Sequence, residues 1–514
     1  MRFFNTTGPS FPEDHYMLPP GDRLVGAQLD RYIRDKLYWC LHAPRQTGKT
    51  TFLLNWQREL STVNKVAACY VSLERCQGIT KTERAMPAIC EAIRESAGKL
   101  QLPVPAVKTA EPYSMLSAVL TEWAALTDPK PLVVLFDETD VLEGDVLISF
   151  LRQLRDGFAT RGIGIFPVSI ALVGMRDLKD YITVAKGGVP VNPGSPFNIK
   201  EDSAVLSNFT KEDIARLFAQ RTEETGQEIE IAALEYVWEQ SRGQPWIVNS
   251  LFKRSTMRVL DEDCYDEVKE KHVREAREQI VLARETHLDS LAYRLKEPGV
   301  RYVMETLLSG NIDTNLLGSD AWRLCVDLGL VTIENGNPGI SNPMYREVVA
   351  REITYSTQYM IAHPEWQWEK ADGSLDMDTL LREFQFFWRR NSELWEAKSD
   401  YTEAFPHLLL MAFLQRVLNG GGYINREYAA GRGRMDLYIE YKGYRYIIEI
   451  KLVHSYETPV EIKAEGLKQI VRYCDQIGSN ASAYLVIFDR RTDKPSWETR
   501  LKWSTDGGIT VVEC

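Results

Sequence analysis

The first 200 residues alternate short apolar runs with longer amphipathic stretches. Strands of a parallel sheet are covered on both faces, so they are built from continuous apolar residues. The runs that fit this description are LYWCLH (37–42), VAACYVSL (66–73), LVVLF (132–136) and SIALVG (169–174). Stretches with helical spacing, such as FLLNWQRELS and MPAICEAIRESAGKL, separate them. Strands that alternate with helices predict an α/β layer structure with right-handed crossovers.

The pattern becomes helical from residue 210 to about residue 291. Gly226 and Gly243 lie where helices are expected to end, because glycine accepts the left-handed backbone of a helix C-terminus. Two further helical stretches and a turn-rich segment, ENGNPG, follow. The order helix, helix, hairpin is typical of a winged helix. The alternative is that these helices extend the helical region before them.

A second α/β unit follows an aromatic and polar stretch around residues 358–374, which we expect to be a linker. This unit contains a helix (TEAFPHLLLMAFLQRV), two alternating strands, a second helix (LKQIVRYCDQI) and an apolar strand (ASAYLVIFD). We find no internal repeat and no low-complexity tract in the sequence.

The length of 514 residues is too great for one hydrophobic core and predicts three or four domains. With 44% hydrophobic and 26% charged residues, the composition is that of a soluble globular protein rather than a disordered one. No apolar run approaches the roughly 18 residues of a membrane span, and residues 1–16 lack the apolar core of a secretory signal. We therefore expect a cytoplasmic protein that does not associate with membranes.

Cysteine, histidine and charge restrict the chemistry. Eight cysteines form no CxxC pair and seven histidines form no HxxxH pair, which argues against a zinc site and a disulfide framework. Any metal must therefore bind to carboxylates. The net charge of −11 is unusual for a nucleic-acid binder, but residues 398–514 contain 16 basic and 15 acidic residues, so the acidity lies elsewhere.

The sequence HAPRQTGKTTFLL follows the first strand and resembles a Walker A loop. Gly48, Lys49 and Thr50 form its GK[ST] end, and Ala43 stands where the pattern has glycine. In such a loop the amides point at phosphate, Lys49 lies along the β- and γ-phosphates, and Thr50 binds Mg²⁺. The residues that we expect to contact nucleotide here are Pro44, Arg45, Gln46, Thr47, Gly48, Lys49, Thr50 and Thr51.

Two acidic residues end the third apolar run and supply a second half of the site. Asp137 is expected to contact Mg²⁺ through water, and Glu138 to polarise the water that attacks ATP. Arg176 follows the fourth strand and is placed to sense the γ-phosphate; its alternative is a surface arginine. Arg152 and Arg155 are candidates for arginine fingers in trans or for a solvated helix face.

These motifs, together with FNTTGP, HYMLPP, SPFNI, ETGQ and GQPWIVN, resemble bacterial AAA-like ATPases of the STAND class. Archaeal relatives of that class join a P-loop domain to a winged helix and a nuclease-like domain. The resemblance implies that Gly243-Gln244-Pro245 is the GxP element of a helical lid, whose Pro245 contacts the nucleotide, and that Arg176 is the sensor arginine. It also implies a switch in which nucleotide state sets the angle between core and lid. Homo-oligomerisation on ATP binding is a further expectation.

The C-terminal unit contains the segment RGRMDLYIEYKGYRYIIEIKL. Lys442-Gly443 predicts a hairpin turn between two strands. Glu449 and Lys451 are two residues apart and therefore project from one face of the second strand, to which the hairpin can bring Asp436. Two carboxylates can hold Mg²⁺, and a lysine beside them can position water or stabilise the charge that develops during phosphodiester cleavage.

This segment resembles the PD-(D/E)xK nuclease superfamily, although Met435 stands in place of the proline. The resemblance implies Glu403 as an additional metal ligand and Gln469 with Tyr473 as a QxxxY motif, in which Gln469 joins the catalytic set. Mn²⁺ is an alternative ion for such a site. The nearby basic residues, which could contact phosphates or be surface charges, are Arg426, Arg432 and Arg434.

We therefore expect an α/β multidomain chain. Its parts are a P-loop ATPase core (1–208), a helical lid (209–283), a winged helix (284–355), a linker (356–394) and a nuclease-like domain (395–514). The expected function is an ATP-dependent switch that controls a metal-dependent nuclease acting on double-stranded DNA, for example in defence against phage or mobile elements. The alternative is a DNA- or partner-binding switch whose nuclease fold is catalytically silent.

Overall fold

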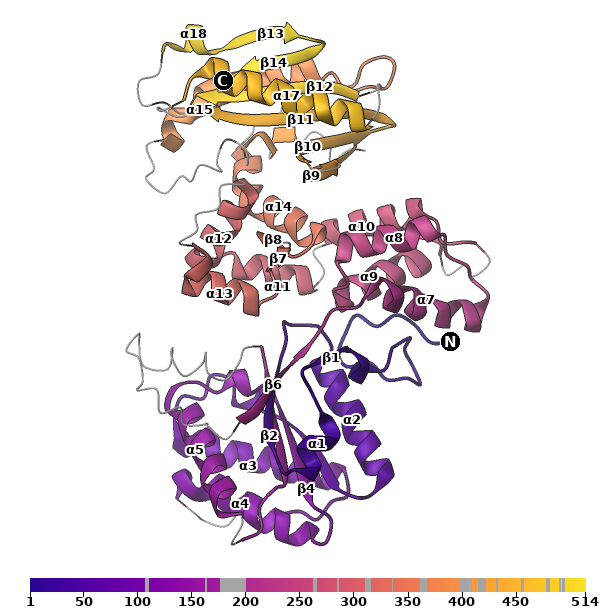
Figure 1. Ribbon diagram of the computed structural model, residues 1–514, viewed down its shortest axis with the longest axis vertical. Coiled ribbons are helices and arrows are strands. Elements are labelled where there is room, and N and C mark those ends of the chain that lie inside the picture. The colour runs from indigo at the N-terminus through magenta and orange to yellow at the C-terminus, as the bar shows by residue number, and fades with distance from the viewer. Residues whose placement is uncertain are drawn as a thin grey trace. The chain divides into compact units, whose positions relative to one another are not determined.

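A computed structural model describes residues 1–106, 111–161, 164–175, 200–261, 266–283, 286–309, 316–334, 336–360, 368–396, 406, 409–411, 413–414, 422–430, 433–453, 457–477, 481–489, 491 and 495–514 (Figure 1). Within these ranges, the side chains of 200–202, 282, 286, 309, 354–360, 390–396, 422–430, 433–436 and 476–477 are not described. The chain forms two compact units. The first comprises Met1–His287, Arg323–Ile333 and Ser341–Met344; the second comprises Leu288–Trp322, Glu334–Ile340 and Tyr345–Cys514.

The first unit contains a six-stranded sheet in the order β1-β6-β2-β5-β4-β3, parallel except at the β1–β6 edge. Its strands are β1 (Leu24–Val25), β2 (Tyr38–His42), β3 (Ala67–Ser72), β4 (Leu132–Asp137), β5 (Ser169–Gly174) and β6 (Lys200–Leu206). The four apolar runs are confirmed as the strands β2 to β5. The predicted α/β fold class is therefore confirmed for this unit.

Helices cover both faces of this sheet (Figure 1). They are α1 (Leu29–Arg34), α2 (Lys49–Val63), α3 (Thr82–Lys99), α4 (Pro112–Thr127) and α5 (Gly144–Thr160). Trp39, Phe52 and Trp56 form the aromatic centre of the core between α2 and the sheet. Trp123 and Phe150 belong to the core on the opposite face, under α3, α4 and α5. Each such buried aromatic side chain stabilises the fold by about 1.5–3 kcal/mol.

A helical region follows the sheet. Its helices are α7 (Lys211–Thr225), α8 (Ile231–Ser241), α9 (Pro245–Arg254), which continues into η4 (Ser255–Val259), and α10 (Glu270–Ala283). Thr210 and Asp213 form a capping box that starts α7. As predicted, α7 ends at Gly226, which has a φ of 78°. The helix α8 ends at Arg242, directly before Gly243, and both have positive φ.

Substitution of Gly243 by alanine is expected to lower the melting temperature of the first unit. Gly243 has a φ of +75°, and a Cβ atom there would lie 1.9 Å from the carbonyl oxygen of Phe209. The Phe209 oxygen belongs to the main chain, so the clash cannot be relieved by rotating a side chain and the backbone must shift. We therefore expect the free energy of unfolding to fall by more than the ~1 kcal/mol of an alanine with a left-handed backbone. Gly226→Ala is the matched control, because it has a similar φ but no atom within 4 Å of the added Cβ. Calorimetry should show the larger loss for Gly243→Ala; equal losses would contradict the steric argument.

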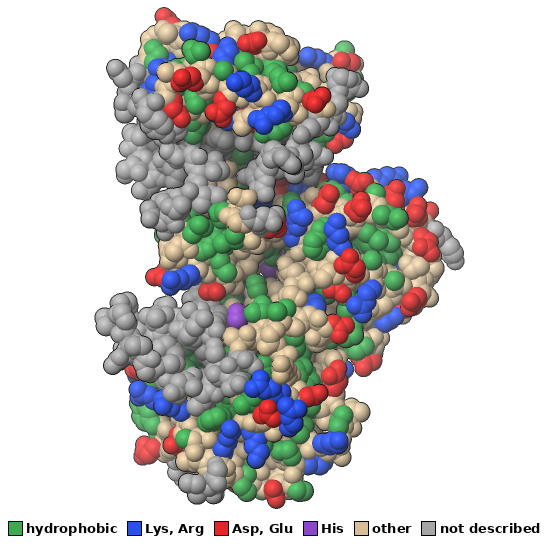
Figure 2. Space-filling model, viewed as in Figure 1, with side chains coloured by type: hydrophobic (Ala, Val, Ile, Leu, Met, Phe, Trp, Pro, Cys, Tyr) green, Lys and Arg blue, Asp and Glu red, His purple; other side chains and the backbone are tan. Residues whose placement is uncertain are grey.

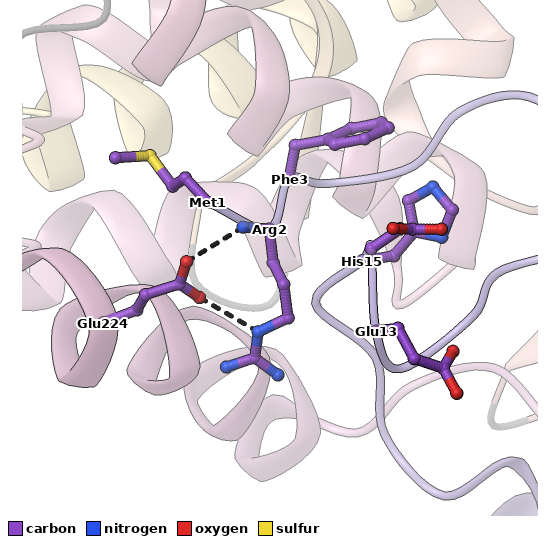
Figure 3. A pocket seen from close by; sticks show the side chains of 7 residues that line it. Met1, Arg2, Phe3, Glu13, His15 and Glu224 are labelled. Atoms are coloured by element: carbon purple, nitrogen blue, oxygen red, sulfur yellow. Dashed lines mark hydrogen bonds and ion pairs between the residues drawn. The ribbon is translucent and has the colours of Figure 1, made fainter.

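The N-terminal segment is tied to the helical region rather than to the sheet alone. Figure 3 shows Arg2 beside Glu224 of α7, which accepts from the Arg2 backbone N–H and from Nε, both at 2.9 Å. Phe3 and His15 pair in a β-bridge, and their rings lie 4.6 Å apart. The first 20 residues therefore connect the helical region to the P-loop side of the core.

The next part of the chain contains α11 (Thr286–Arg294), α12 (Pro298–Ser309), η5 (Leu316–Gly318), α13 (Asp320–Asp327), β7 (Val331–Glu334), β8 (Asn337–Ile340) and α14 (Pro343–Met360). The strands β7 and β8 form a two-stranded sheet. The winged helix stays a prediction for this segment.

The second unit contains a mixed six-stranded sheet in the order β13-β14-β12-β11-β10-β9. Its strands are β9 (Gly422–Ala430), β10 (Gly433–Tyr441), β11 (Tyr444–Val453), β12 (Ala481–Asp489), β13 (Lys502–Asp506) and β14 (Ile509–Glu513). The pairs β11–β12 and β12–β14 are parallel, and the others are antiparallel. Lys442 and Gly443 make the predicted turn between β10 and β11, both with positive φ.

Helices also lie on the two faces of this sheet. The helix α17 (Pro459–Ile477) packs on β11 and β12, where Ile470 lies with Leu485 and Ile487 in one apolar core. The short helix α18 (Trp497–Arg500) precedes β13. On the other face, Phe384 and Trp388 of α15 (Met377–Glu396) contact Phe488 of β12.

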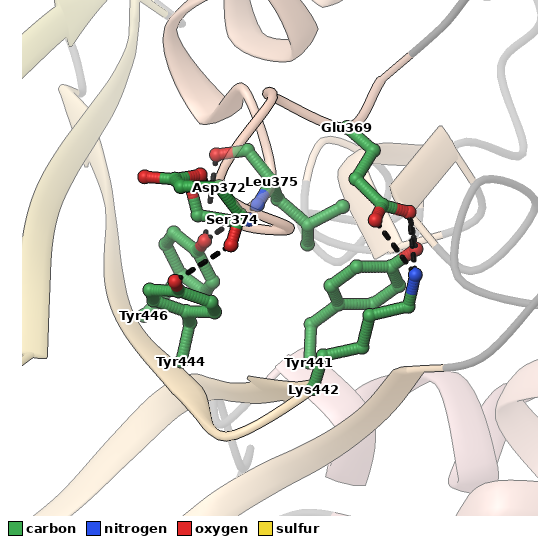
Figure 4. A network of polar contacts seen from close by, with 8 residues as sticks. All are labelled: Glu369, Asp372, Ser374, Leu375, Tyr441, Lys442, Tyr444 and Tyr446. Carbon is green, nitrogen blue, oxygen red and sulfur yellow. Dashed lines mark hydrogen bonds and ion pairs between the residues drawn. The ribbon is translucent and has the colours of Figure 1, made fainter.

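The expected linker at 356–394 requires correction, because much of it packs with this sheet. The amide of Gln385 on α15 donates to the carbonyl of Glu513, and the Trp503 indole donates to Gln385. Figure 4 shows a second connection, in which Glu369 binds Lys442 and Tyr441 while the Tyr446 hydroxyl accepts from the backbone N–H of Leu375. The unit that carries the β10–β11 hairpin therefore includes residues from 368 onward.

Among the helices that the structure describes, none combines the length and apolar character required to cross a bilayer. Figure 2 shows basic and acidic side chains interspersed on the face that it draws. The net charge of −11 is thus not gathered into one acidic patch on that face.

Candidate functional sites

The phosphate loop has the predicted strand, turn and helix arrangement. It leaves β2 at His42 and enters α2 at Lys49. Two residues of the loop have positive φ, Gln46 at 57° and Gly48 at 96°, which makes the sharp turn. Ala43, in the position of the usual glycine, is buried, and its N–H donates to the carbonyl of Gly174 at 3.3 Å. Ala43 is not among the residues of the loop that have positive φ, so the backbone at this position does not require glycine.

Lys49 is folded over its own loop. Its ammonium donates to the carbonyls of Ala43 at 2.7 Å and Pro44 at 2.8 Å. Burial is the main cause that lowers the pKa of Lys49 to about 8, against the opposing effect of nearby Asp137. A buried cation that is held by neutral acceptors is poorly compensated, and a polyanion such as a triphosphate would compensate it.

Thr50 and Asp137 lie together at the C-terminal end of β4. The Thr50 hydroxyl donates to Oδ2 of Asp137 at 2.6 Å, and the Tyr70 hydroxyl donates to the same oxygen at 3.1 Å. Asp137 is almost fully buried. A hydroxyl and a carboxylate at this spacing are the donor types that Mg²⁺ prefers, so the two residues fit the ion that the motif implies.

Glu138 is the next residue along the chain and has a left-handed backbone with a φ of 59°. Its carboxylate accepts from the Ser72 hydroxyl at 3.2 Å. Burial, followed by the charge of Asp137, raises the pKa of Glu138. Burial likewise raises the pKa of Asp140. Glu138 therefore has the raised basicity that a general base requires.

A cavity of about 900 Å³ in the first unit joins these groups. The predicted residues that line it are Arg45, Gln46, Thr47, Gly48, Lys49, Thr50, Thr51, Asp137, Glu138 and Pro245. Pro44 takes part through its carbonyl bond to Lys49. Arg176 lies outside the described residues. Arg152 and Arg155 are not among the lining residues; Arg152 instead borders a separate groove between α4 and α5.

The cavity also contains residues that sequence reasoning missed. Trp246 of α9 donates from its indole to the carbonyl of Thr6, and both line the cavity. The Ser10 N–H donates to the hydroxyl of Thr51 in α2 at 3.0 Å. The N-terminal segment therefore bridges α2 and α9 across the cavity. Its polar sequence contains no periodic signal that would have placed it there.

Arg23 is a second missed residue. Its guanidinium donates to the carbonyls of Ser207 at 2.8 Å and Thr47 at 2.9 Å, and it lies over the ring of Phe209. Burial lowers the pKa of Arg23 to about 10. A Cβ atom on Gly48 would lie 2.9 Å from Arg23 Nη2, so this position requires glycine for space as well as for its φ. Arg23, the residue directly before β1, thus stabilises the phosphate loop through its bond to Thr47.

In the second unit, the structure brings Glu449 and Lys451 together on β11. Lys451 Nζ lies 3.6 Å from Glu449 Oε1, whose side chain is 4% exposed. The parallel register pairs these residues with Leu485 and Ile487 of β12, and so orients them toward α17. Gln469 of α17 has a buried Oε1 atom with no hydrogen-bond partner among the described residues. Tyr473 packs in the apolar cluster that α17 forms with the sheet.

The remaining predicted ligands are not described at the side-chain level. The β10–β11 register pairs Leu437 with Ile448, so the backbone of Asp436 is one position beyond, next to that of Glu449. Glu403 and Arg432 lie outside the described residues, as do the side chains of Arg426 and Arg434. Within the described part of the chain, no three acidic, histidine or cysteine residues form a metal-binding group.

Glu449 itself fits a cation site. A carboxylate that is almost fully removed from water is stabilised by positive charge, and a metal ion would add a second source of it to the Lys451 ammonium 3.6 Å away. A divalent ion bound by Glu449 and Asp436 would supply that charge and polarise a phosphate, while Lys451 would hold the water or the developing negative charge.

Comparisons with known proteins find one family model and several solved structures that are similar to parts of this chain. Residues 401–486 match the family model of the PD-(D/E)XK nuclease superfamily. Similar solved structures include a Walker-type ATPase of Pyrococcus abyssi, with 14% identity and a TM-score of 0.48 over 67% of this chain and 99% of that one. RuvB of Thermotoga maritima, a Holliday junction branch migration motor, has 16% identity and a TM-score of 0.34 over 62% and 90%. Cdc6p of Pyrobaculum aerophilum has 14% identity and a TM-score of 0.36 over 64% and 91%.

No curated protein matches the chain. The family match, the phosphate loop that precedes α2 and the parallel sheet behind it nevertheless agree on one architecture. The chain joins an N-terminal P-loop ATPase fold to a C-terminal PD-(D/E)XK nuclease-like domain.

Proposed function

We propose that the protein is an ATP-binding and ATP-hydrolysing switch of the STAND type that controls a Mg²⁺-dependent nuclease acting on double-stranded DNA. The observation that carries the proposal is the presence in one chain of two buried charges, Lys49 at a phosphate loop and Glu449 in a nuclease-superfamily domain. A triphosphate would add negative charge beside the buried Lys49 ammonium, and a metal ion would add positive charge beside the buried Glu449 carboxylate. Defence against phage or mobile DNA is the setting that would require such control.

At the nucleotide site, Lys49 would turn from the loop carbonyls to the β- and γ-phosphates. Thr50 would exchange its bond to Asp137 for Mg²⁺, and Asp137 would hold a water of that ion. Glu138 would orient and deprotonate the attacking water, for which its raised pKa is suited. Arg176 is the proposed sensor of the γ-phosphate.

The switch would act through residues that share the cavity with the loop. Gln244 of the GxP element donates to the carbonyl of Gln46 at 3.4 Å, and Pro245 and Trp246 line the cavity. A nucleotide that moves Gln46 would therefore act directly on the start of α9. Movement of α9 would be passed to the segment 284–355, the proposed winged helix, and oligomerisation in the ATP state is a further part of the proposal.

A nuclease assay on a panel of nucleotides tests the proposal. Linear and supercoiled DNA would be incubated with Mg²⁺ or Mn²⁺ and no nucleotide, ADP, ATP or a non-hydrolysable ATP analogue. We expect wild-type cleavage to depend on nucleotide state, Asp436→Ala to leave DNA intact under every condition, and Lys49→Ala to lose the dependence on nucleotide. RNA in parallel reactions tests the choice of substrate. If wild type and Asp436→Ala leave DNA equally intact throughout, the nuclease fold is silent and the alternative of a binding switch holds.

Binding of ATP is expected to take up protons at pH 8.5. The pKa of Lys49 in the free protein is about 8, so the ammonium is mostly deprotonated at pH 8.5 and mostly protonated at pH 7. A bound triphosphate stabilises the charged form and raises this pKa, so uptake must be larger at pH 8.5. Calorimetry in buffers of different ionisation enthalpy measures it. Lys49→Arg keeps its charge at both pH values and is the control; equal uptake by wild type at pH 7 and 8.5 would contradict the assignment.

A further inference from the structure

The Lys451 ammonium lies between two carboxylates of different character. Glu449 Oε1 is 3.6 Å away on the buried side, and Glu465 Oε1 of α17 is 3.0 Å away on the outer side. The Glu449 side chain is 4% exposed and the Glu465 side chain 59%. Glu449 is therefore fixed by burial, whereas Glu465 can leave the ion pair at little cost, about 0–1 kcal/mol for exposed pairs.

A glycine brings Glu465 to this position. A Cβ atom on Gly466 would lie 3.3 Å from Lys451 Cγ and 2.6 Å from Leu485 Cδ1. Only glycine thus lets α17 approach β11 this closely, and the stem of Lys451 is held between the strand and the helix. Glu465, the preceding residue of α17, consequently sits at the outer edge of the site, where the Lys451 ammonium emerges.

We propose that Glu465 is a positioning residue, which holds the Lys451 ammonium at the outer edge of the nuclease site until the scissile phosphate displaces the Glu465 carboxylate. This inference rests on the proposed nuclease function. A phosphodiester of the substrate carries one negative charge. It therefore competes with the Glu465 carboxylate for the Lys451 ammonium, and the two negative groups repel each other. Because the Glu465 side chain is exposed, it can turn into solvent, while the buried Glu449 would stay in place to hold a metal ion. Glu465 therefore weakens substrate binding without taking part in the chemical step.

The substitution Glu465→Gln tests this role in the full-length protein. We expect KM for DNA to fall about two- to fivefold, the range of an exposed ion pair, with kcat unchanged within about twofold. Glu461→Gln is the matched control. It removes the same charge one turn earlier on α17, where Glu461 is exposed and bonds to Thr458 instead of Lys451. A fall in kcat at constant KM, or equal KM values for the two variants, would overturn the proposal.

A second measurement does not depend on cleavage. Acylation of individual lysines by a small amine-reactive reagent, followed by mass spectrometry, reports how far the ion pair with Glu465 restricts access to the Lys451 amine. We expect the labelling rate of Lys451 relative to Lys463 to rise about twofold or more in Glu465→Gln and to stay at the wild-type value in Glu461→Gln. Unchanged labelling in Glu465→Gln overturns the inference. A wild-type protein that cuts no DNA but shows the labelling difference refutes the proposed function alone.

Discussion

Lys49→Ala is expected to weaken ATP binding by about 100-fold or more and to abolish hydrolysis. Lys49 is a buried ammonium at the phosphate loop, and each charged hydrogen bond that it would give to a phosphate oxygen is worth about 1.5–3 kcal/mol. Two such bonds correspond to a factor of at least about 100. Titration with a fluorescent ATP analogue measures the affinity, and phosphate release measures hydrolysis.

The fold should survive this substitution. The carbonyls of Ala43 and Pro44, which accept from Lys49, lie next to Arg45 and Gln46 at the wall of the 900 Å³ cavity, so water that enters the space left by Lys49 can hydrate them. Because burial lowers the Lys49 pKa, the charged side chain opposes folding at neutral pH, and its removal should leave the melting temperature the same or higher. Lys65→Ala, an exposed lysine just beyond α2, is the control. If Lys49→Ala binds ATP as tightly as Lys65→Ala, the loop is not a phosphate site.

Glu449→Gln is expected to reduce DNA cleavage by about 1000-fold or more. The amide has the same shape but no charge, so it binds Mg²⁺ poorly and no longer neutralises Lys451, 3.6 Å away. Loss of several kcal/mol of metal-derived stabilisation of the transition state corresponds to such a factor. The measurement is single-turnover cleavage of labelled duplex DNA at saturating Mg²⁺, with the nucleotide that supports wild-type activity.

Glu498→Gln is the matched control for that variant, since it makes the same chemical change at an exposed position of α18. Metal binding supplies an independent readout. Mn²⁺ should raise the melting temperature of the second unit in wild type and in Glu498→Gln, and the increase should be smaller in Glu449→Gln. Cleavage by Glu449→Gln at the wild-type rate would remove Glu449 from the metal site.

The elements that could be predicted are those whose signal is local. The loop that ends in Gly48, Lys49 and Thr50, the turn at Lys442-Gly443 and the helix end at Gly226 each depend on the backbone preference of a few neighbouring residues. β6 was not predicted, because KEDSAVL is polar at one end. Its outer neighbour β1 is only two residues long, so β6 is nearly an edge strand and does not need a continuous apolar sequence.

The expected linker failed for a related reason. Its aromatic and polar composition suggested a solvated connection, but Phe384 and Trp388 of α15 bury their rings against Phe488, about 100 residues later in the chain. Composition alone cannot tell whether a mixed aromatic segment has a distant partner. The contact that decides it is formed only when the sheet is in place.

The sequence alone determined the residue types of both sites: a lysine and a threonine at a phosphate loop, two acids after a strand, and an alternating Glu449 and Lys451 on one strand face. Only the tertiary structure decided which distant groups stand beside them. Arg23 braces the loop, Trp246 and the N-terminal segment close the cavity, and Glu465 meets Lys451 across Gly466. Motifs report short-range backbone geometry, whereas these contacts join residues that are brought together by the packing of separate elements.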